Sequence, residues 1–315
     1  MTKVAFVFPG QGSQLVGMGK ELIEIHDDSK YFFDKADRVL GYQLGKLITE
    51  GPQEELTLTY NAQPALLTVG SMIADRLIEG GISPDYAAGH SLGEYTALVV
   101  SGVLSFEDGV SIVHQRGLFM NEAVPAGEGA MAAILGLDVE KLKEVTDIIT
   151  ADGFAVQMAN LNCPGQIVIS GTKLGVEKAC VQLKEAGAKR AIPLDVSGPF
   201  HSSLMKPAAE KLAAVLESVE MEEAEIPVIA NVNASVVEDS NEIKGLLIEQ
   251  IYSPVLWEDS VRTLLELGVT HFIECGPGKV LSGLMKKIDK NATVFSVYDE
   301  ETLQVVIEAS KKGWS

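Results

Sequence analysis

One short motif has the residue types and the spacing of a serine nucleophile. Residues 89–94 read Gly-His-Ser-Leu-Gly-Glu, which fits the pattern Gly-x-Ser-x-Gly. The residues around it predict a short strand over 86–88 and an apolar helix over 94–100. A strand, a sharp turn and a helix in this order form a nucleophile elbow, which would lift the Ser91 hydroxyl to the carboxyl edge of a sheet. A purely structural glycine-rich turn is the alternative.

A serine hydroxyl becomes a good nucleophile only beside a base, and the sequence offers five histidines. His201 is the best candidate, because it follows Gly198 and Pro199 in a loop at a junction of elements, where sites are commonly built. A packed or capping histidine is the alternative. No carboxylate stands out as the group that orients the base in a hydrolase triad, since Asp195 is expected within a strand. The less suitable histidines are His26, His90, His114 and His271.

The composition restricts the class of partner. The chain has 315 residues, of which 46% are hydrophobic and 22% charged, and its formal net charge is −19. This charge argues against nucleic acid or an anionic membrane as the main partner. An acidic protein would have to dock on a local basic patch, unless the basic residues simply form solvated helix faces. The candidates for such a patch are Lys189, Arg190, Lys286 and Lys287.

The three cysteines, Cys163, Cys180 and Cys275, do not have the spacing of a zinc site. Their small, odd number predicts reduced thiols in a cytoplasmic protein, and their apolar neighbours predict burial. The apolar residues 4–8 are too few for a signal peptide, and no apolar run reaches the length of a membrane span. The sequence does not fix the oligomeric state, for which a monomer is the default expectation.

The order of apolar segments predicts an α/β fold with two subdomains. Strands over 4–8, 227–231, 270–274 and 293–297 alternate with helices, which is typical of a mostly parallel sheet. Residues 127–196 instead show the βαββαβ order of a ferredoxin-like unit. We therefore expect a large α/β-hydrolase-like subdomain of residues 1–126 and 197–315, with the small ferredoxin-like subdomain inserted in it. One helix of the large subdomain is expected to begin at Gln63, because residues 61–64, which end with Pro64, form a helix start signal.

Six motifs together resemble one enzyme family, the malonyl-CoA:acyl-carrier-protein transacylases. The resemblance extends from residue 3 to about residue 298. Each motif is weak alone, but their common order and spacing is specific. They read Pro9-Gly10-Gln11-Gly12-Ser13-Gln14, Gly89-His90-Ser91-Leu92-Gly93-Glu94, Gln115-Arg116-Gly117-x-x-Met120, Asn160-x-Asn162-x-Pro164-Gly165-Gln166, Gly198-Pro199-Phe200-His201-Ser202 and Glu274-Cys275-Gly276-Pro277-Gly278-x-Val280-Leu281.

The resemblance implies catalytic roles for five of the matching residues. Ser91 would receive the malonyl group as an ester, and His201 would act first as base and then as acid. The backbone N–H groups of Gln11 and Leu92 would form the oxyanion hole. The main-chain carbonyl of Gln250 would orient His201 in place of a carboxylate, so that the Gln250 side chain would only pack.

The resemblance also implies a substrate and a reaction. Arg116 would bind the malonyl carboxylate, although an arginine on an apolar helix could also extend to the surface. Gln63, Asn160 and Asn162 would line the pocket. The enzyme would transfer malonyl groups from malonyl-CoA to the phosphopantetheine thiol of acyl carrier protein in a ping-pong reaction for fatty acid synthesis. No metal or other cofactor is expected.

Three other functions stay open at this point. A serine hydrolase of the esterase or lipase type would use the same nucleophile, but it would need an acidic triad member and no cation for the acyl group. An acyltransferase serving polyketide synthesis would use the same chemistry on other carrier proteins. A catalytically inactive scaffold that binds carrier protein is disfavoured by the presence of Ser91, His201 and Gln11.

Overall fold

The larger of two sheets is built around β1 (Val4–Phe8), whose five residues are all buried. The computed structural model describes residues 2–314, and the strand order in this sheet is β10-β9-β1-β2-β7-β8. All neighbouring strands are parallel except β7 and β8, which confirms the expected α/β class with a mostly parallel sheet. The other strands are β2 (Tyr86–Gly89), β7 (Val228–Ile229), β8 (Val236–Val237), β9 (His271–Cys275) and β10 (Thr293–Val297).

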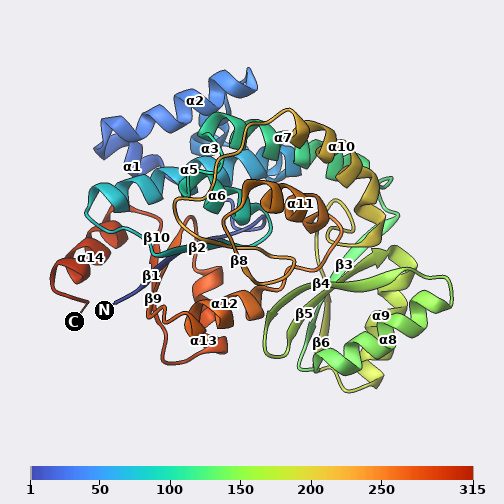
Figure 1. Ribbon diagram of the computed structural model, residues 1–315. Helices are drawn as coiled ribbons and strands as arrows, with labels where there is room; N and C mark the ends of the chain where they lie inside the picture. Colours follow the sequence, from blue (N-terminus) through green and yellow to red (C-terminus); the bar gives the residue numbers. More distant parts are fainter. Residues whose placement is uncertain (1, 315) are drawn as a thin grey trace.

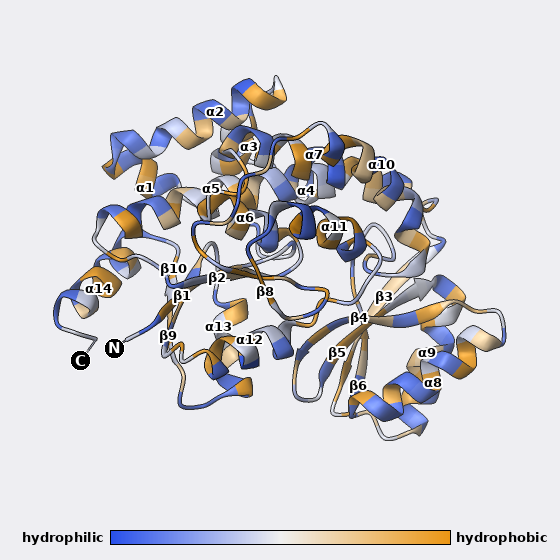
Figure 2. Cartoon of the chain, viewed as in Figure 1, coloured by the Kyte–Doolittle hydropathy of each residue, from blue (hydrophilic) through white to orange (hydrophobic). Residues whose placement is uncertain are grey.

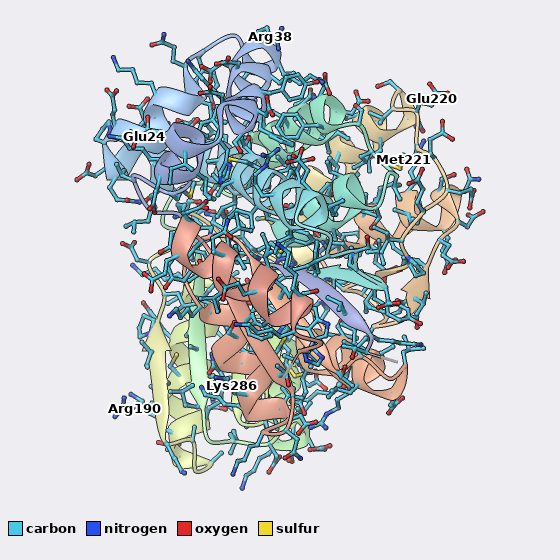
Figure 3. The ribbon with its side chains drawn as sticks, turned by 90° about the vertical axis from the view of Figure 1, so that its left-hand side faces the viewer. Glu24, Arg38, Arg190, Glu220, Met221 and Lys286 are labelled. Atoms are coloured by element: carbon cyan, nitrogen blue, oxygen red, sulfur yellow. The ribbon has the colours of Figure 1, made fainter. Side chains whose placement is uncertain are left out.

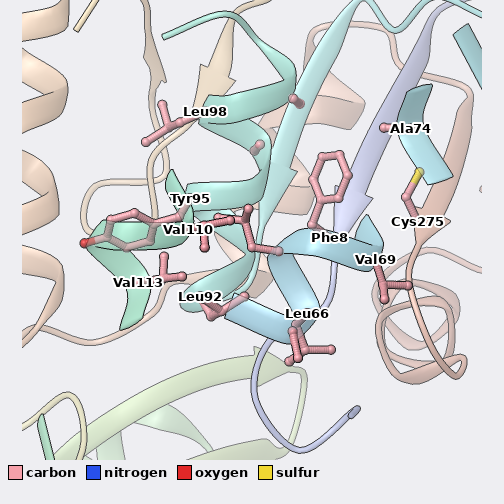
Figure 4. Packing of buried hydrophobic residues seen from close by; sticks show 14 of the residues in the cluster. Phe8, Leu66, Val69, Ala74, Leu92, Tyr95, Leu98, Val110, Val113 and Cys275 are labelled. Carbon is pink, nitrogen blue, oxygen red and sulfur yellow. The ribbon is translucent and has the colours of Figure 1, made fainter. Parts of the chain in front are cut away.

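Helices cover both faces of this sheet, as Figure 1 shows. Successive residues of a strand point to opposite faces, so Phe6 and Phe8 enter one core while Ala5 and Val7 enter the other. Figure 4 shows Phe8 in the first core near Leu92. Burial on both faces explains why β1 is apolar throughout. The first core is covered by α5 (Thr59–Glu79), α6 (Leu92–Val100) and α7 (Phe106–Glu122), and the second by α12 (Trp257–Glu266) and α13 (Val280–Ile288).

The second sheet is antiparallel and has the strand order β4-β5-β3-β6. Its helices α8 and α9 lie on one side of it, and their surfaces alternate between hydrophilic and hydrophobic residues (Figures 1 and 2). This βαββαβ unit has a core of its own, and we propose residues 127–196 as the small subdomain. Its elements are β3 (Gly129–Leu135), α8 (Val139–Ala151), β4 (Val156–Cys163), β5 (Gln166–Thr172), α9 (Lys173–Glu185) and β6 (Arg190–Pro193).

The small sheet contacts the large subdomain next to a residue expected in the pocket. Val255 donates its N–H to the carbonyl of Ala159 and accepts from the N–H of Leu161, both at 2.9 Å. Asn160 therefore lies where β4 of the small subdomain meets the large one. This junction allows one cavity to be lined by both subdomains.

The remaining helices surround the large sheet. None of the helices within residues 2–314 combines the length and the apolar character needed to cross a membrane. They are α1 (Lys20–Ile25), α2 (Lys30–Leu40), α3 (Leu44–Glu50), α4 (Gln53–Thr57), α10 (Lys206–Glu217), α11 (Ser240–Gln250) and α14 (Glu300–Lys311), with short 3-10 turns at Asp27–Ser29 and Ser203–Met205.

Several sequence-based expectations were wrong in detail. The strand expected over 227–231 covers only Val228–Ile229. Helix α5 begins at Thr59 rather than Gln63, so Pro64 lies inside it. Proline lacks an N–H and leaves the carbonyl of Tyr60 free, but His114 Nδ1 contacts that oxygen at 2.8 Å. Strand β6 ends at Pro193, so Asp195 lies outside it and is exposed. Cys180 is half-buried rather than part of the core.

Candidate active site

Ser91 lies in a tight turn between β2 and α6, so the expected strand, turn and helix are all present. Its backbone is strained, with φ 53° and ψ −108°. Glycine is required on both sides: a Cβ at Gly89 would lie 1.9 Å from the carbonyl carbon of Gly93, and a Cβ at Gly93 would lie 2.1 Å from the carbonyl oxygen of Phe8. The local sequence thus presents the serine at the carboxyl edge of the sheet.

Asn231, which the sequence analysis missed, stabilises this strained turn. It is fully buried directly after β7, the neighbour of β2. Its Oδ1 accepts the N–H of Ser91 at 2.7 Å, and its Nδ2 donates to the carbonyl of Gly89, also at 2.7 Å. A polar residue at the carboxyl end of the strand beside the elbow was the available signal, because carboxyl ends of parallel strands meet at one edge.

His201 is the histidine that the fold brings to Ser91. The Oγ of Ser91 lies 2.7 Å from His201 Nε2, and His201 Nδ1 lies 2.8 Å from the main-chain oxygen of Gln250. A carbonyl can only accept, so Nδ1 carries the proton and Nε2 is free to accept from the serine. The Gln250 carbonyl is available because it is at the end of α11, where carbonyls lack helical partners.

The electrostatic surroundings keep this imidazole neutral. Burial and, secondarily, the nearby cation of Arg116 lower the pKa of His201 from 6.5 to about 3. A neutral imidazole is the form that can accept a proton from Ser91.

Arg116 is buried beside the serine, so the surface alternative was wrong; only 1% of its area is exposed. Its Nη1 donates to Gln63 Oε1 at 2.8 Å, and its Nη2 donates to Gln250 Oε1 at 2.9 Å and to Ser91 Oγ at 3.2 Å. Helix α7 reaches α5 this closely because of Gly117, where a Cβ would lie 2.6 Å from the Cα of Tyr60. These three hydrogen bonds to neutral oxygens hold a cation next to the nucleophile.

The side chain of Gln250 does more than pack, contrary to expectation. Besides accepting from Arg116, it donates through Nε2 to the carbonyl of Ser91 at 3.0 Å and to Glu94 Oε2 at 2.7 Å. Glu94 was missed by the sequence analysis, although an acid in the first turn of an apolar helix was a signal of a buried polar group. Burial raises the pKa of its carboxyl from 4.5 to about 7.

A cavity of about 340 Å³ opens above the serine. Gln11 and Leu92 line it, and the backbone N–H groups of these two residues donate to no other group within residues 2–314. Asn160 also lines this cavity, whereas Asn162 lines a second cavity of about 200 Å³ next to it. There Asn162 Oδ1 lies 2.8 Å from His90 Nε2. The backbone N–H groups of Gln11 and Leu92 are thus free to donate to a developing oxyanion.

The basic residues expected to bind an acidic partner lie at one end of the small sheet. Lys287 Nζ donates to Gln166 Oε1 at 3.2 Å. Gln166 pairs with Leu135 of β3, which pairs in turn with Arg190 of β6. Two strand spacings therefore separate the Gln166 and Arg190 positions, roughly 10 Å. In Figure 3, Arg190 and Lys286 both lie on the lower part of the face shown.

Within residues 2–314, no three histidine, cysteine or acidic side chains come together in a way that could hold a metal ion.

Comparison with known proteins gives consistent results. The model of the acyl transferase domain family matches residues 5–306. A Bacillus subtilis (strain 168) protein named malonyl CoA-acyl carrier protein transacylase is 60% identical over 312 residues, which is 99% of this chain and 98% of that protein. The structure of an acyl carrier protein S-malonyltransferase from Vibrio cholerae has a TM-score of 0.95 at 47% identity, covering 97% of this chain and all of that one. A malonyl-transacylase solved in complex with its type II PKS acyl-carrier protein also has a TM-score of 0.95, at 44% identity over 98% of this chain and 99% of that one.

Proposed function

The chain belongs to the acyl transferase domain family, and we propose that it transfers malonyl groups from malonyl-CoA to the phosphopantetheine thiol of acyl carrier protein, as an S-malonyltransferase of fatty acid synthesis. The observation that carries the residue assignment is the position of Arg116, whose Nη2 lies 3.2 Å from the Oγ of Ser91. A carboxylated acyl group bound to this serine would have a buried cation within reach. Arginine suits this task because its planar fork can donate to both carboxylate oxygens.

In the first half-reaction, Ser91 Oγ attacks the thioester carbonyl of malonyl-CoA while His201 Nε2 takes the serine proton. The carbonyl oxygen becomes an oxyanion, which the backbone N–H groups of Gln11 and Leu92 stabilise. The C–S bond then breaks, and the coenzyme A thiolate leaves with the proton that His201 returns. The product is a malonyl ester on Ser91.

The second half-reaction reverses these steps with a different thiol. His201 takes the proton of the phosphopantetheine thiol, and the sulfur attacks the ester carbonyl. Collapse of the oxyanion releases Ser91 Oγ, which regains its proton from His201. The same residues thus serve both halves, and this chemistry requires neither a metal nor a redox cofactor. We place the reaction in the cytoplasm, in keeping with three cysteines that are not in disulfides.

A serine hydrolase fits this geometry less well. His201 is oriented by a main-chain oxygen rather than by a carboxylate, and the cavity contains a buried cation that an uncharged ester does not need. A transferase must also protect its ester from water, and the burial of His201, the proposed base beside this ester, supports this.

Intact-mass spectrometry after incubation with malonyl-CoA tests the proposal. We expect a malonyl adduct on the wild type that disappears when acyl carrier protein is added, and no adduct on Ser91→Ala. An adduct on Ser91→Ala would contradict the nucleophile assignment. Release as free malonate without a carrier would indicate a hydrolase, and absence of any adduct would indicate a scaffold. Carrier proteins of fatty acid and polyketide synthesis, offered as competing acceptors, would show which is served.

A further inference from the structure

We propose that Glu94 is a positioning residue. It connects the turn at Ser91, the residue Gln250 that orients His201, and the proposed carboxylate-binding residue Arg116. The carboxyl group contacts none of the reacting atoms. It lies below them, with 2% of its area exposed, in the first turn of α6. The inference rests on the proposed function, because it concerns how Arg116 is held ready for a carboxylated acyl group.

The first connection runs through the side chain of Gln250. Its Nε2 faces two acceptors, the carbonyl of Ser91 and the Oε2 of Glu94, and its Oε1 faces the donor Arg116 Nη2. Without the Glu94 oxygen, the amide would lose the stronger of the two acceptors that fix its orientation. A rotated amide would present N–H groups to a guanidinium, which has no acceptor. Glu94 therefore determines that Gln250 offers Arg116 an oxygen.

The second connection runs through Asn231. The Oε2 of Glu94 also accepts the backbone N–H of Asn231 at 3.2 Å. The Asn231 side chain in turn holds the N–H of Ser91 and the carbonyl of Gly89. The Oε2 of Glu94 therefore accepts from two residues: Asn231, which holds the strained turn at Ser91, and Gln250, whose main chain orients His201.

The positioning role proposed for Glu94 requires an acceptor oxygen rather than a full charge. Burial raises the pKa of Glu94 to about 7, so both protonation states are present near neutral pH. The charged group that faces it is Arg116, from α7. Glutamine has the same length and offers one acceptor oxygen. Glu94→Gln should therefore restore most of what Glu94→Ala loses.

The measurement is competition between malonyl-CoA and acetyl-CoA for acylation of Ser91, read by intact mass together with the melting temperature. Glu94→Ala is expected to lower the malonyl-to-acetyl ratio by roughly tenfold, the effect of about one hydrogen bond to a charged group, and Glu94→Gln to recover most of it. The matched control is Glu274→Ala. It removes another fully buried acid, which accepts the backbone N–H groups of Leu281 and Ser282, and none of these three residues lines the 340 Å³ cavity above the serine. It should lower the melting temperature without changing the ratio.

A double-mutant cycle separates positioning from general destabilisation. If Glu94 acts through Gln250, the ratio in Glu94→Ala/Gln250→Ala should be no lower than in the worse single variant. Additive losses, an unchanged ratio in Glu94→Ala, or equal losses in Glu94→Ala and Glu94→Gln would each overturn the inference. If Glu94→Ala does not fold, Gln250→Met tests the same connection, because it removes the Gln250 amide. An unchanged malonyl-to-acetyl ratio in Gln250→Met would then overturn the inference. The proposed function fails on different outcomes: the wild type gives no malonyl adduct, or it releases the adduct as free malonate without a carrier.

Discussion

The Nη2 of Arg116 donates to the Oγ of Ser91 at 3.2 Å. The same oxygen lies 2.7 Å from His201 Nε2, so the nucleophile contacts both the proposed base and the proposed carboxylate anchor. Because the guanidinium is already in place, little reorganisation is needed when a malonyl group arrives, and preorganised groups are the effective ones in catalysis.

The pH dependence of acylation should reflect the lowered pKa of His201. Because that pKa is about 3 rather than 6.5, the base stays neutral in mild acid. The acid limb of kcat/KM should therefore lie well below pH 6.5. A truncated malonyl thioester without phosphate groups is the suitable substrate, since coenzyme A phosphates titrate in the same range. An inflection near 6.5 with this substrate would contradict the assignment.

The lowered pKa of His201 also predicts the direction in which the stability of the protein changes with pH. Between about pH 6.5 and pH 3 the unfolded chain binds a proton at position 201 that the folded chain does not. The free energy of unfolding should therefore fall as the pH falls through this window. His201→Gln, which cannot titrate, should show a smaller slope of melting temperature against pH.

The main elements of the fold were predictable from the sequence because their signals are local. The bounds of β1 and β10 agree to the residue with the strands expected over 4–8 and 293–297. The start of α5 was not predictable, because Pro64 is tolerated only through a contact from His114, far along the chain. A local pattern cannot show which distant group supplies a missing partner.

The residues of the candidate site also differ in whether the sequence alone could identify them. Ser91, His201 and Arg116 belong to motifs that can be recognised in the chain. Glu94 and Asn231 had local signals of burial and of position at the sheet edge, but their hydrogen bond joins residues 137 apart, so those signals could not show which groups they contact. The side chain of Gln250 was likewise underestimated, because its three hydrogen bonds depend on how α11 packs against the elbow.

Glycine at position 93 should be required for a folded elbow. Gly93→Ala would place a Cβ 2.1 Å from the carbonyl oxygen of Phe8, a backbone atom of the central strand that cannot move freely. Overpacking of this kind typically costs about 1–3 kcal/mol, and the displaced turn should also abolish acylation. The matched control is Gly245→Ala on the exposed face of α11, where an added Cβ meets nothing within 4 Å. It should stabilise the protein by about 0.5–1 kcal/mol. Chemical denaturation measures both, and equal effects would contradict the steric argument.

Carrier protein should dock on the basic end of the small sheet. Lys286→Glu/Lys287→Glu should raise the KM for acyl carrier protein and leave the KM for malonyl-CoA nearly unchanged, because charges on a docking surface act mainly on association. Lys20→Glu/Lys46→Glu, on α1 and α3, is a control with the same change in net charge. The measurement is steady-state kinetics at two ionic strengths, since added salt should reduce the difference. Equal effects of the two double variants would show that only net charge matters.

Arg116 should determine the preference for malonyl over acetyl groups. In the resting site its partners are the neutral oxygens of Gln63, Gln250 and Ser91. A malonyl carboxylate adds a charge-assisted pair to this buried guanidinium, whereas an acetyl group adds nothing. Loss of one member of such a buried pair costs about 3–5 kcal/mol. Arg116→Ala should therefore reduce malonyl acylation by roughly two orders of magnitude or more, while acetyl acylation stays level or rises.

Two further variants distinguish recognition from packing. Arg116→Lys should recover only part of the malonyl activity, because lysine keeps the charge but loses the planar fork. Arg76→Ala removes another largely buried arginine, which pairs with Asp75 and Glu79 at the end of α5. It should lower the melting temperature and leave the malonyl-to-acetyl ratio unchanged. The assay is competition between the two acyl-CoA thioesters for Ser91. If Arg116→Ala kept the wild-type ratio, the carboxylate would have to be bound by another group, and Arg116 would serve only to hold Gln63 and Gln250 in place.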